Sequence, residues 1–487
     1  MSSLLTRRFV LSGLAAAAAG PALANAPTTS IRPVPRGEVP PKPAPPPATG
    51  LIQAAGLGGA VAYQVVNAET GELVEEFNPG LRLPPASVAK AATAFFALSR
   101  LSGAHRFDTS LLATGPVSAG RVEGDLILRG AGDPTLDTDA LGALIASLKE
   151  RGIHEVAGNF RVDASALPAV PHIDPGQPDH VGYNPAISGL NLNFNRVHFE
   201  WKRSGGSYAV SMQARAQKFR PEVRIARMSV EDRAVPIYTY DDYNGVDSWT
   251  VARRALGDAG SRWLPVSRPT DYAAEVFMTL ARSHGIVLAR GFDADGVQGT
   301  PIVTRQSEPL KDMLRGMLRY STNLTAEAIG LSAAQANGVQ PESLIRSARE
   351  MNTWLNRDLG THSCGFVDHS GLGYGSRVSP ADMVHLMRAA RQASELPEIL
   401  RAFRVDAPGV KVLAKTGTLN FVSALSGFVD APGTPPLAFA ILTADMPRRD
   451  AIPVAERERP PGGRAWAGRS RNLQRRLIER WVSMASS

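Results

Sequence analysis

The C-terminal third of the chain has the clearest pattern of hydrophobic and polar positions. Apolar side chains recur at positions i, i+3, i+4, i+7 and i+8 over 310–318, which predicts an amphipathic helix with its apolar face toward a core. The apolar runs 412–418, 424–429 and 437–443 predict three successive strands. A last amphipathic helix is expected over 472–483, with its many arginines on the solvated face.

The pattern near the start of the folded region predicts a hairpin that leads into a helix. Residues 60–67 and the run that ends at Phe77 have the composition of strands, with a turn at 69–71 between them. Proline is excluded from helix interiors, whereas the alanine-rich run after Pro85 contains good helix formers. We therefore expect a helix that begins near Ser87.

The middle of the chain has a different texture. A strand, a helix and a second strand are predicted over 124–162. Residues 168–261 are rich in loops with short β-like runs, and a helix over 271–283 is expected to be capped by Thr270. We interpret this block as inserted material, with one domain nested in another.

The N-terminus has the features of an export signal. Two arginines precede a short apolar run, and a small-x-small cleavage site ends at Ala26, so a signal peptide is expected over 1–26. Arg7 and Arg8 resemble a twin-arginine signal, and a general secretory signal is an equal alternative. Because the apolar run is short for a membrane span, we expect cleavage and a place in the periplasm or cell envelope, with at most peripheral membrane contact. A proline-rich linker is expected over 27–50.

Composition narrows the possibilities. The chain of 487 residues is too long for one compact core, and its only cysteine, Cys364, excludes an intramolecular disulfide. Removal of Arg7 and Arg8 with the signal peptide takes the formal net charge from +8 to +6. This mild basicity could favour anionic wall polymers or membrane surfaces, although it usually marks solubility alone, and no nucleic-acid partner is expected. The nine histidines lack the spacing of metal ligands, so we expect no metal, and no cofactor. The oligomeric state is open.

Ser87 and Lys90 are the first candidates for chemistry. They lie three residues apart on the expected helix, so the lysine amine can approach the serine hydroxyl. Burial of the lysine would lower its pKa and make the serine an activated nucleophile. The alternative is an N-terminal serine and a solvent-exposed lysine on an ordinary helix. Lysine is scarce in this chain, which makes a chance pairing less frequent.

Two shorter motifs follow. Lys415-Thr416-Gly417-Thr418 continues an apolar run, so a cation and two hydroxyls project from a strand that Gly417 leaves open to a ligand. Such an edge would suit a peptide carboxylate bound by strand addition, and the alternative is a surface turn. Ser321-Thr322-Asn323 is weaker, because the same Ser-x-Asn pattern recurs at 470–472, where a helix cap explains it.

The three motifs in this order are those of penicillin-binding proteins and serine β-lactamases. The chain resembles a low-molecular-mass class C penicillin-binding protein of the D-alanyl-D-alanine carboxypeptidase/endopeptidase family, which has a long insertion between its first and second motifs. The segments 132–136, 190–195 and 368–372 also resemble family segments. Thr322 departs from the family's usual aspartate, and His369 from its usual glycine.

This resemblance implies an α/β (α+β) fold with a serine β-lactamase/transpeptidase-like catalytic domain, in which helices flank an antiparallel sheet. The catalytic domain would comprise 51–107 and 309–487, with a β-rich inserted region at 108–308. Within the insertion, 108–165 plus 262–308 would form a second domain and 166–261 a nested third domain.

The resemblance also assigns roles to the motif residues. Ser87 would be the nucleophile and Lys90 its general base. Ser321 would relay a proton to the leaving amine, and Lys415 would set the electrostatics of the site. Asn323 would bind the substrate amide, and further substrate contacts would come from Thr416, Gly417 and Thr418. The hydroxyls of Thr416 and Thr418 would hold the terminal carboxylate, and the backbone N–H groups of Ser87 and Thr418 would form the oxyanion hole. Glu327 and His369 are interpreted as structural.

The implied function is that of a serine-type D-Ala-D-Ala carboxypeptidase, and also a DD-endopeptidase, that acts on peptidoglycan stem peptides and is inhibited by β-lactam antibiotics. A serine β-lactamase shares this chemistry but must deacylate quickly, and the long insertion argues against it. A non-catalytic peptidoglycan-binding protein that keeps the fold is a further alternative.

Overall fold

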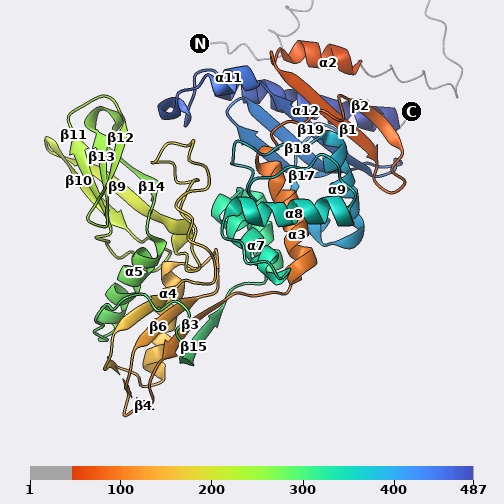
Figure 1. Ribbon diagram of the computed structural model, residues 1–487. Coiled ribbons are helices and arrows are strands. Elements are labelled where there is room, and N and C mark those ends of the chain that lie inside the picture. Colours follow the sequence, from red (N-terminus) through yellow and green to blue (C-terminus); the bar gives the residue numbers. More distant parts are fainter. Residues whose placement is uncertain (1–46, 486–487) are drawn as a thin grey trace, which may run out of the picture. The chain divides into compact units, whose positions relative to one another are not determined.

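The computed structural model describes residues 47–485 (Figure 1). The predicted signal peptide and most of the predicted linker therefore lie outside the described residues. The first described element, helix α2 (Ala48–Ala55), already covers the last three residues of the range 27–50. The linker prediction is wrong at that end, because the chain becomes helical directly after Pro47.

A six-stranded antiparallel sheet is built from both ends of the described chain. Its strand order is β16-β17-β18-β19-β1-β2. The strands are β1 (Ala60–Asn67), β2 (Leu73–Phe77), β16 (Arg401–Ala402), β17 (Lys411–Leu419), β18 (Val422–Asp430) and β19 (Leu437–Ala444). Because Ala60 pairs with Ala444 and Asn67 with Leu437, the predicted N-terminal hairpin joins the three predicted C-terminal strands in one sheet.

Both faces of this sheet are covered by helices. Successive residues of a strand point to opposite faces, and in β19 Ala438 and Leu442 belong to one buried cluster whereas Phe439 and Ile441 belong to another. The first face packs against α3 (Ala89–Leu101), α6 (Leu310–Tyr320), α7 (Asn323–Ala336), α8 (Leu344–Asp358) and α9 (Pro380–Ala393). The second packs against α2 and α12 (Gly463–Ala485). A strand buried on both faces reads as a continuous apolar run.

The region between α3 and α6 forms four further sheets, three larger ones and one of very short strands, and its elements share a large buried cluster. The first sheet contains β3 (Asp108–Ala113), β6 (Leu126–Gly130), β8 (Phe160–Asp163) and β15 (Thr300–Gln306), beside α4 (Thr138–Glu150) and α5 (Pro269–Ser283). The second contains β9 (Arg196–Ser204), β10 (Ser207–Gln213) and β14 (Ala259–Pro265), and the third β11 (Ala226–Glu231), β12 (Tyr238–Tyr243) and β13 (Val246–Ala252). The short strands β4 (Val117–Ser118), β5 (Arg121–Val122) and β7 (Glu155–Val156) pair nearby.

The two ends of this region lie side by side. Strands β3 and β15 are antiparallel neighbours, with Asp108 opposite Gln306. A long segment can therefore leave the region of the six-stranded sheet and its helices and return to it at nearly the same place. Its division into a second and a nested third domain stays a prediction.

Several element boundaries differ from those expected. Helix α5 begins at Pro269, so Thr270 lies inside its first turn, and no side chain caps the helix; the cap prediction is wrong. The last helix begins at Gly463, nine residues before the predicted start. No helix within residues 47–485 is long and apolar enough to cross a membrane.

Candidate active site

Ser87 lies on a tight turn at the floor of a groove. It occupies the middle of a 3₁₀ turn (Ala86–Val88) that precedes α3, because Pro84 and Pro85 exclude a longer helix. Ala86 has a φ of +47°, a backbone conformation that is rare for residues other than glycine. The half-buried Ser87 lines a groove of about 1220 Å³. Backbone strain of this kind is typical of functional sites.

Lys90 lies one turn further on and is completely buried. Its Nζ donates to Asn323 Oδ1 at 2.7 Å and to the Ser370 carbonyl oxygen at 2.7 Å, and it lies 3.1 Å from Ser87 Oγ. An ammonium group has three protons, so the three partners account for all of them. When the amine is neutral, two partners still need protons and the lone pair is left for the Ser87 hydroxyl.

Burial makes the neutral form of Lys90 accessible. Desolvation lowers the pKa of the Lys90 amine to about 8, while the charges of Glu327 and Asp368 act in the opposite direction. A general base is most effective when its pKa is close to the working pH. Lys90 therefore has the position and the basicity to take the proton of Ser87.

The second motif is joined to the third by a hydrogen bond. Ser321 ends α6 in the left-handed conformation, with a φ of +59°. Its Oγ accepts from Lys415 Nζ at 3.1 Å, and the same amine donates to the Thr416 carbonyl oxygen at 2.7 Å. Burial and the nearby charge of Lys90 lower the pKa of the Lys415 amine to about 7. Proton transfer between Lys415 and Ser321 is therefore accessible near neutral pH.

Asn323 is the first residue of α7, and its side-chain amide is fixed at both ends. Oδ1 accepts from Lys90, and Nδ2 donates to the Tyr183 carbonyl oxygen at 2.8 Å. Tyr183 belongs to the inserted region. The insertion thus contacts a motif residue directly, and no sequence pattern predicts this contact.

Strand β17 brings the third motif against the serine turn. A Cβ atom on Gly417 would lie 2.7 Å from the Pro85 carbonyl oxygen and 3.0 Å from the Ser87 nitrogen, so only glycine fits there. Lys415 and Gly417 are buried, whereas Thr416 and Thr418 are exposed. Thr418 lines the groove, but Thr416 is not one of its lining residues.

Two buried carboxylates hold the loop that supports Lys90. Glu327 accepts the backbone N–H groups of His369 at 3.0 Å and Ser370 at 2.8 Å. Asp368 accepts the backbone N–H of Gly371 at 2.9 Å. Burial raises the pKa of both carboxyl groups. These bonds fix the Ser370 peptide, whose carbonyl oxygen receives the Lys90 amine.

His369 is buried away from the groove, as expected for a residue that supports the fold. Its imidazole is fully buried, burial lowers its pKa to about 3, and its Nε2 lies 2.8 Å from Ser347 Oγ. A Cβ atom on Gly330 would lie 2.1 Å from the imidazole ring, so the ring packs directly on the backbone of α7. The ring does not line the groove.

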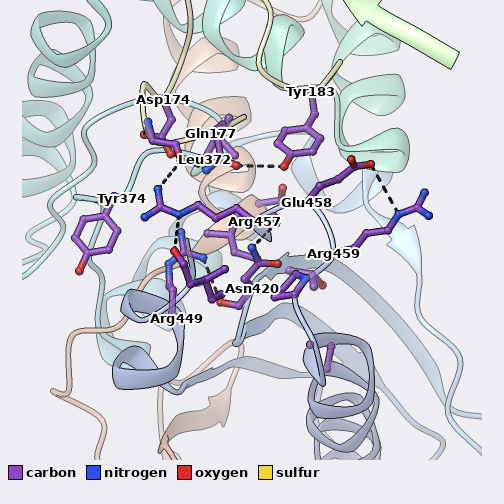
Figure 2. Close-up of a pocket in the computed structure, with 18 of the residues that line it drawn as sticks. Asp174, Gln177, Tyr183, Leu372, Tyr374, Asn420, Arg449, Arg457, Glu458 and Arg459 are labelled. Carbon is purple, nitrogen blue, oxygen red and sulfur yellow. Dashed lines mark hydrogen bonds and ion pairs between the residues drawn. The ribbon is translucent and has the colours of Figure 1, made fainter. Parts of the chain in front are cut away.

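The walls of the groove come from segments far apart in the sequence. Figure 2 shows Asp174, Gln177 and Tyr183 of the insertion opposite residues that follow β19. Glu458 joins the walls, since it lies 2.9 Å from His180 Nε2 and 3.1 Å from Arg262. The sequence pattern predicts only loops with short β-like runs over 168–261, where these wall residues of the insertion lie. Within residues 47–485, no group of three His, Cys, Asp or Glu side chains could hold a metal ion.

Comparison with known proteins identifies the family. Residues 50–458 match the model of the D-Ala-D-Ala carboxypeptidase 3 (S13) family. The chain belongs to this family. It is therefore a peptidase, and the expected membership of the D-alanyl-D-alanine carboxypeptidase family is confirmed.

Two curated relatives align with this chain over most of their length. The chain is 27% identical over 474 residues to a D-alanyl-D-alanine carboxypeptidase of Actinomadura sp. (strain R39), covering 86% of each chain. It is 24% identical over 409 residues to the D-alanyl-D-alanine carboxypeptidase DacB of Haemophilus influenzae, covering 78% of this chain and 84% of the relative.

A solved structure confirms the fold class. The crystal structure of penicillin-binding protein 4 (dacB) from Haemophilus influenzae has a TM-score of 0.73 at 21% identity, covering 89% of this chain and 99% of the other. The same protein has been solved in complex with a β-lactam, and that structure matches with a TM-score of 0.70 at 22% identity. The expected transpeptidase-like fold with additional β-rich domains is thus confirmed.

Proposed function

We propose that this S13 family member is a serine-type D-Ala-D-Ala carboxypeptidase that acts on peptidoglycan stem peptides through an acyl-enzyme at Ser87. The observation that carries the proposal is the environment of Lys90 Nζ. Two acceptors, Asn323 Oδ1 and the Ser370 carbonyl oxygen, each lie 2.7 Å from the amine. They orient it so that its third hydrogen-bonding direction points to Ser87 Oγ, 3.1 Å away. Family membership gives the reaction class, and this geometry supports the assignment of Ser87 and Lys90.

Acylation begins with proton transfer from Ser87 to the neutral Lys90 amine. Ser87 Oγ then bonds to the carbonyl carbon of the penultimate D-Ala. The negative charge that develops on the carbonyl oxygen would be stabilised by the backbone N–H groups of Ser87 and Thr418. This assignment is supported by Gly417, which allows β17 to approach the Ser87 nitrogen closely.

Release of D-Ala requires a proton on the leaving amine. Ser321 lines the groove, and its Oγ accepts a hydrogen bond from the Lys415 amine at 3.1 Å. We assign the relay to Ser321, with Lys415 as its proton source, because a lysine with a pKa of about 7 can give up a proton near neutral pH. Water then hydrolyses the ester bond of the acyl-enzyme.

Substrate binding follows from the same surface. Asn323 would bind the substrate amide, and the exposed Thr418, with Thr416, would hold the terminal carboxylate. Cross-linked stem peptides contain the same kind of bond after a D-amino acid, so DD-endopeptidase activity uses the same residues. A β-lactam would acylate Ser87 in place of the peptide, as the β-lactam complex of the Haemophilus protein suggests. The predicted signal peptide supports export to the periplasm or cell envelope.

Release of D-Ala from a synthetic stem peptide that ends in D-Ala-D-Ala tests the function. The full chain should release D-Ala, and Ser87→Ala should not. Ser207→Ala, which changes an exposed hydroxyl in the β9–β10 hairpin, is the matched control and should remain active. Absence of D-Ala release, together with failure to open a cross-linked muropeptide, would contradict the proposal.

A further inference from the structure

We propose that the groove contains a second recognition site, a cationic patch formed by Arg459, Arg464 and Arg471, which binds the free α-carboxylate of a γ-linked D-glutamate in the stem peptide, upstream of the scissile bond. The patch lines the same groove as Ser87. The inference rests on the proposed function and adds a preference to it, namely for acidic stem peptides over those whose carboxylate is amidated.

The first support is the position of the arginines on α12. Arg464 and Arg471 are seven residues apart, so they lie on the same face of the helix. Ala467 lies between them, and all three residues line the groove. The small alanine leaves room for a ligand group between two long cationic side chains.

The second support is that the charge of the patch is not neutralised within the chain. Of the residues that the structure describes, no acidic side chain forms an ion pair with Arg464 or Arg471, whose side chains are exposed. Arg459 lies 3.8 Å from Glu458 and is 73% exposed, and Glu458 is already paired with Arg262 and His180. Figure 2 shows the side chain of Arg459 beside Glu458.

Other arginines of the groove have a different role. Arg449 donates to the Asn420 carbonyl oxygen at 3.2 Å, and Arg457 donates to the carbonyl oxygens of Gly176 and Ile452. These guanidinium groups hold the walls of the groove together. No hydrogen bond of this kind joins the patch arginines to the described part of the chain, and all three residues are exposed and line the groove.

The third support is the size of the groove. Its volume of about 1220 Å³ exceeds the roughly 300–1,000 Å³ of ordinary small-molecule sites. In the carboxypeptidase reaction only one D-Ala lies on the leaving side, so most of the groove must receive the acyl part of the stem peptide. A guanidinium group binds a carboxylate through charge-assisted, often bidentate, hydrogen bonds, which a neutral amide cannot match.

The test compares two pentapeptides that end in D-Ala-D-Ala and differ at one group. One carries a γ-linked D-glutamate with a free α-carboxylate upstream of the scissile bond, and the other carries its amide. For the full chain, we expect kcat/KM for the free carboxylate to be roughly five- to tenfold higher, the effect of one or two exposed ion pairs. Arg464→Ala/Arg471→Ala should abolish this preference through KM.

A matched variant controls for net charge. Arg469 and Arg476 are also exposed, are also seven residues apart on α12 and do not line the groove. Arg469→Ala/Arg476→Ala should retain the preference. Thermal unfolding of all three proteins shows whether the variants are folded, and the midpoints should agree because the substituted side chains are exposed.

Two results would overturn the inference. One is a full chain that cleaves both peptides equally, and the other is a preference that survives in Arg464→Ala/Arg471→Ala. A full chain that releases D-Ala from neither peptide would instead refute the proposed carboxypeptidase function, and this inference with it, so the two failures are distinguishable.

Discussion

Lys90 Nζ lies 2.7 Å from the carbonyl oxygen of Ser370, a residue 280 positions later in the chain. This contact matters because it removes one of the directions in which the lysine lone pair could point. Asn323 Oδ1 removes a second, so the neutral amine is directed at Ser87. The proposed base is thus oriented toward Ser87 before substrate binds, and preorganised groups of this kind favour catalysis.

Removal of the base should nearly abolish acylation. Lys90→Ala eliminates the proton acceptor of Ser87, so the second-order rate of acylation by benzylpenicillin should fall by roughly 100- to 10,000-fold, as is usual for loss of a general base. Lys149→Ala, at the exposed end of α4, is the control and should react normally. A Lys90→Ala protein that reacts within a factor of two of the full chain would refute the assignment of the base.

The acylation rate should depend on pH, because it depends on whether the Lys90 amine is protonated. Lys90 accepts a proton only when it is neutral, and its pKa is lowered to about 8. The rate should therefore rise with pH below this value and fall at higher pH, where Lys415, the proposed proton source for the leaving group, is neutral. Stopped-flow acylation between pH 5.5 and 9.5 measures the profile. A rate that falls between pH 6 and 8 would mean that the base titrates in the opposite sense.

Substitution of Glu327 should move this profile. The Glu327 charge raises the pKa of Lys90, so Glu327→Gln should shift the rising limb to lower pH. The groups that face this buried cluster are Asp368, His369, Lys415 and Lys90 itself, and Asp174 acts on Asp368. The maximal rate should also fall, because the two loop N–H groups bond to different oxygens of Glu327, and the amide NH2 that replaces one oxygen cannot accept.

Asp133→Asn serves as the matched control for Glu327→Gln. Asp133 is likewise a buried carboxyl group with a raised pKa, but it lies in the inserted region and does not line the groove. Substitution of Asp133 should leave unchanged the pH range over which the acylation rate rises. If Glu327→Gln lowers the rate without moving the limb, Glu327 only supports the loop.

The close approach at Gly417 should tolerate no side chain. In Gly417→Ala the new Cβ would lie 2.7 Å from the Pro85 carbonyl oxygen, so β17 and the serine turn must separate. A displacement of this size should reduce acylation by roughly 100-fold. Gly80→Ala, where a Cβ meets no atom within 4 Å, should have no effect on the rate. Normal acylation of Gly417→Ala would exclude the proposed place of the oxyanion hole.

The sequence predicted what is local and periodic. The approach of Lys90 to Ser87 follows from their spacing on one helical turn, and the strands β17 to β19 follow from their apolar runs. The order of the three motifs became informative only through the family resemblance. The role of Thr416 stays a prediction, since the residue is exposed but does not line the groove.

The remaining features depend on contacts that leave no periodic signal. The bond from Asn323 to the Tyr183 carbonyl oxygen joins two loops, and a backbone acceptor has no sequence signature. The support of the Ser370 peptide by Glu327 depends on how α7 packs beside the loop. The arginines of α12 were interpreted as one solvated face, because amphipathicity alone cannot show that a groove lies beside part of that face.

The most direct test of the central claim is intact-mass analysis of the full chain and of Ser87→Ala after incubation with benzylpenicillin. The account predicts a stable gain of one penicilloyl group in the full chain and none in Ser87→Ala. An adduct that persists in Ser87→Ala, or no adduct on the full chain while the penicillin stays intact, would contradict it. Rapid loss of penicillin without a lasting adduct would also contradict it, and would indicate a β-lactamase.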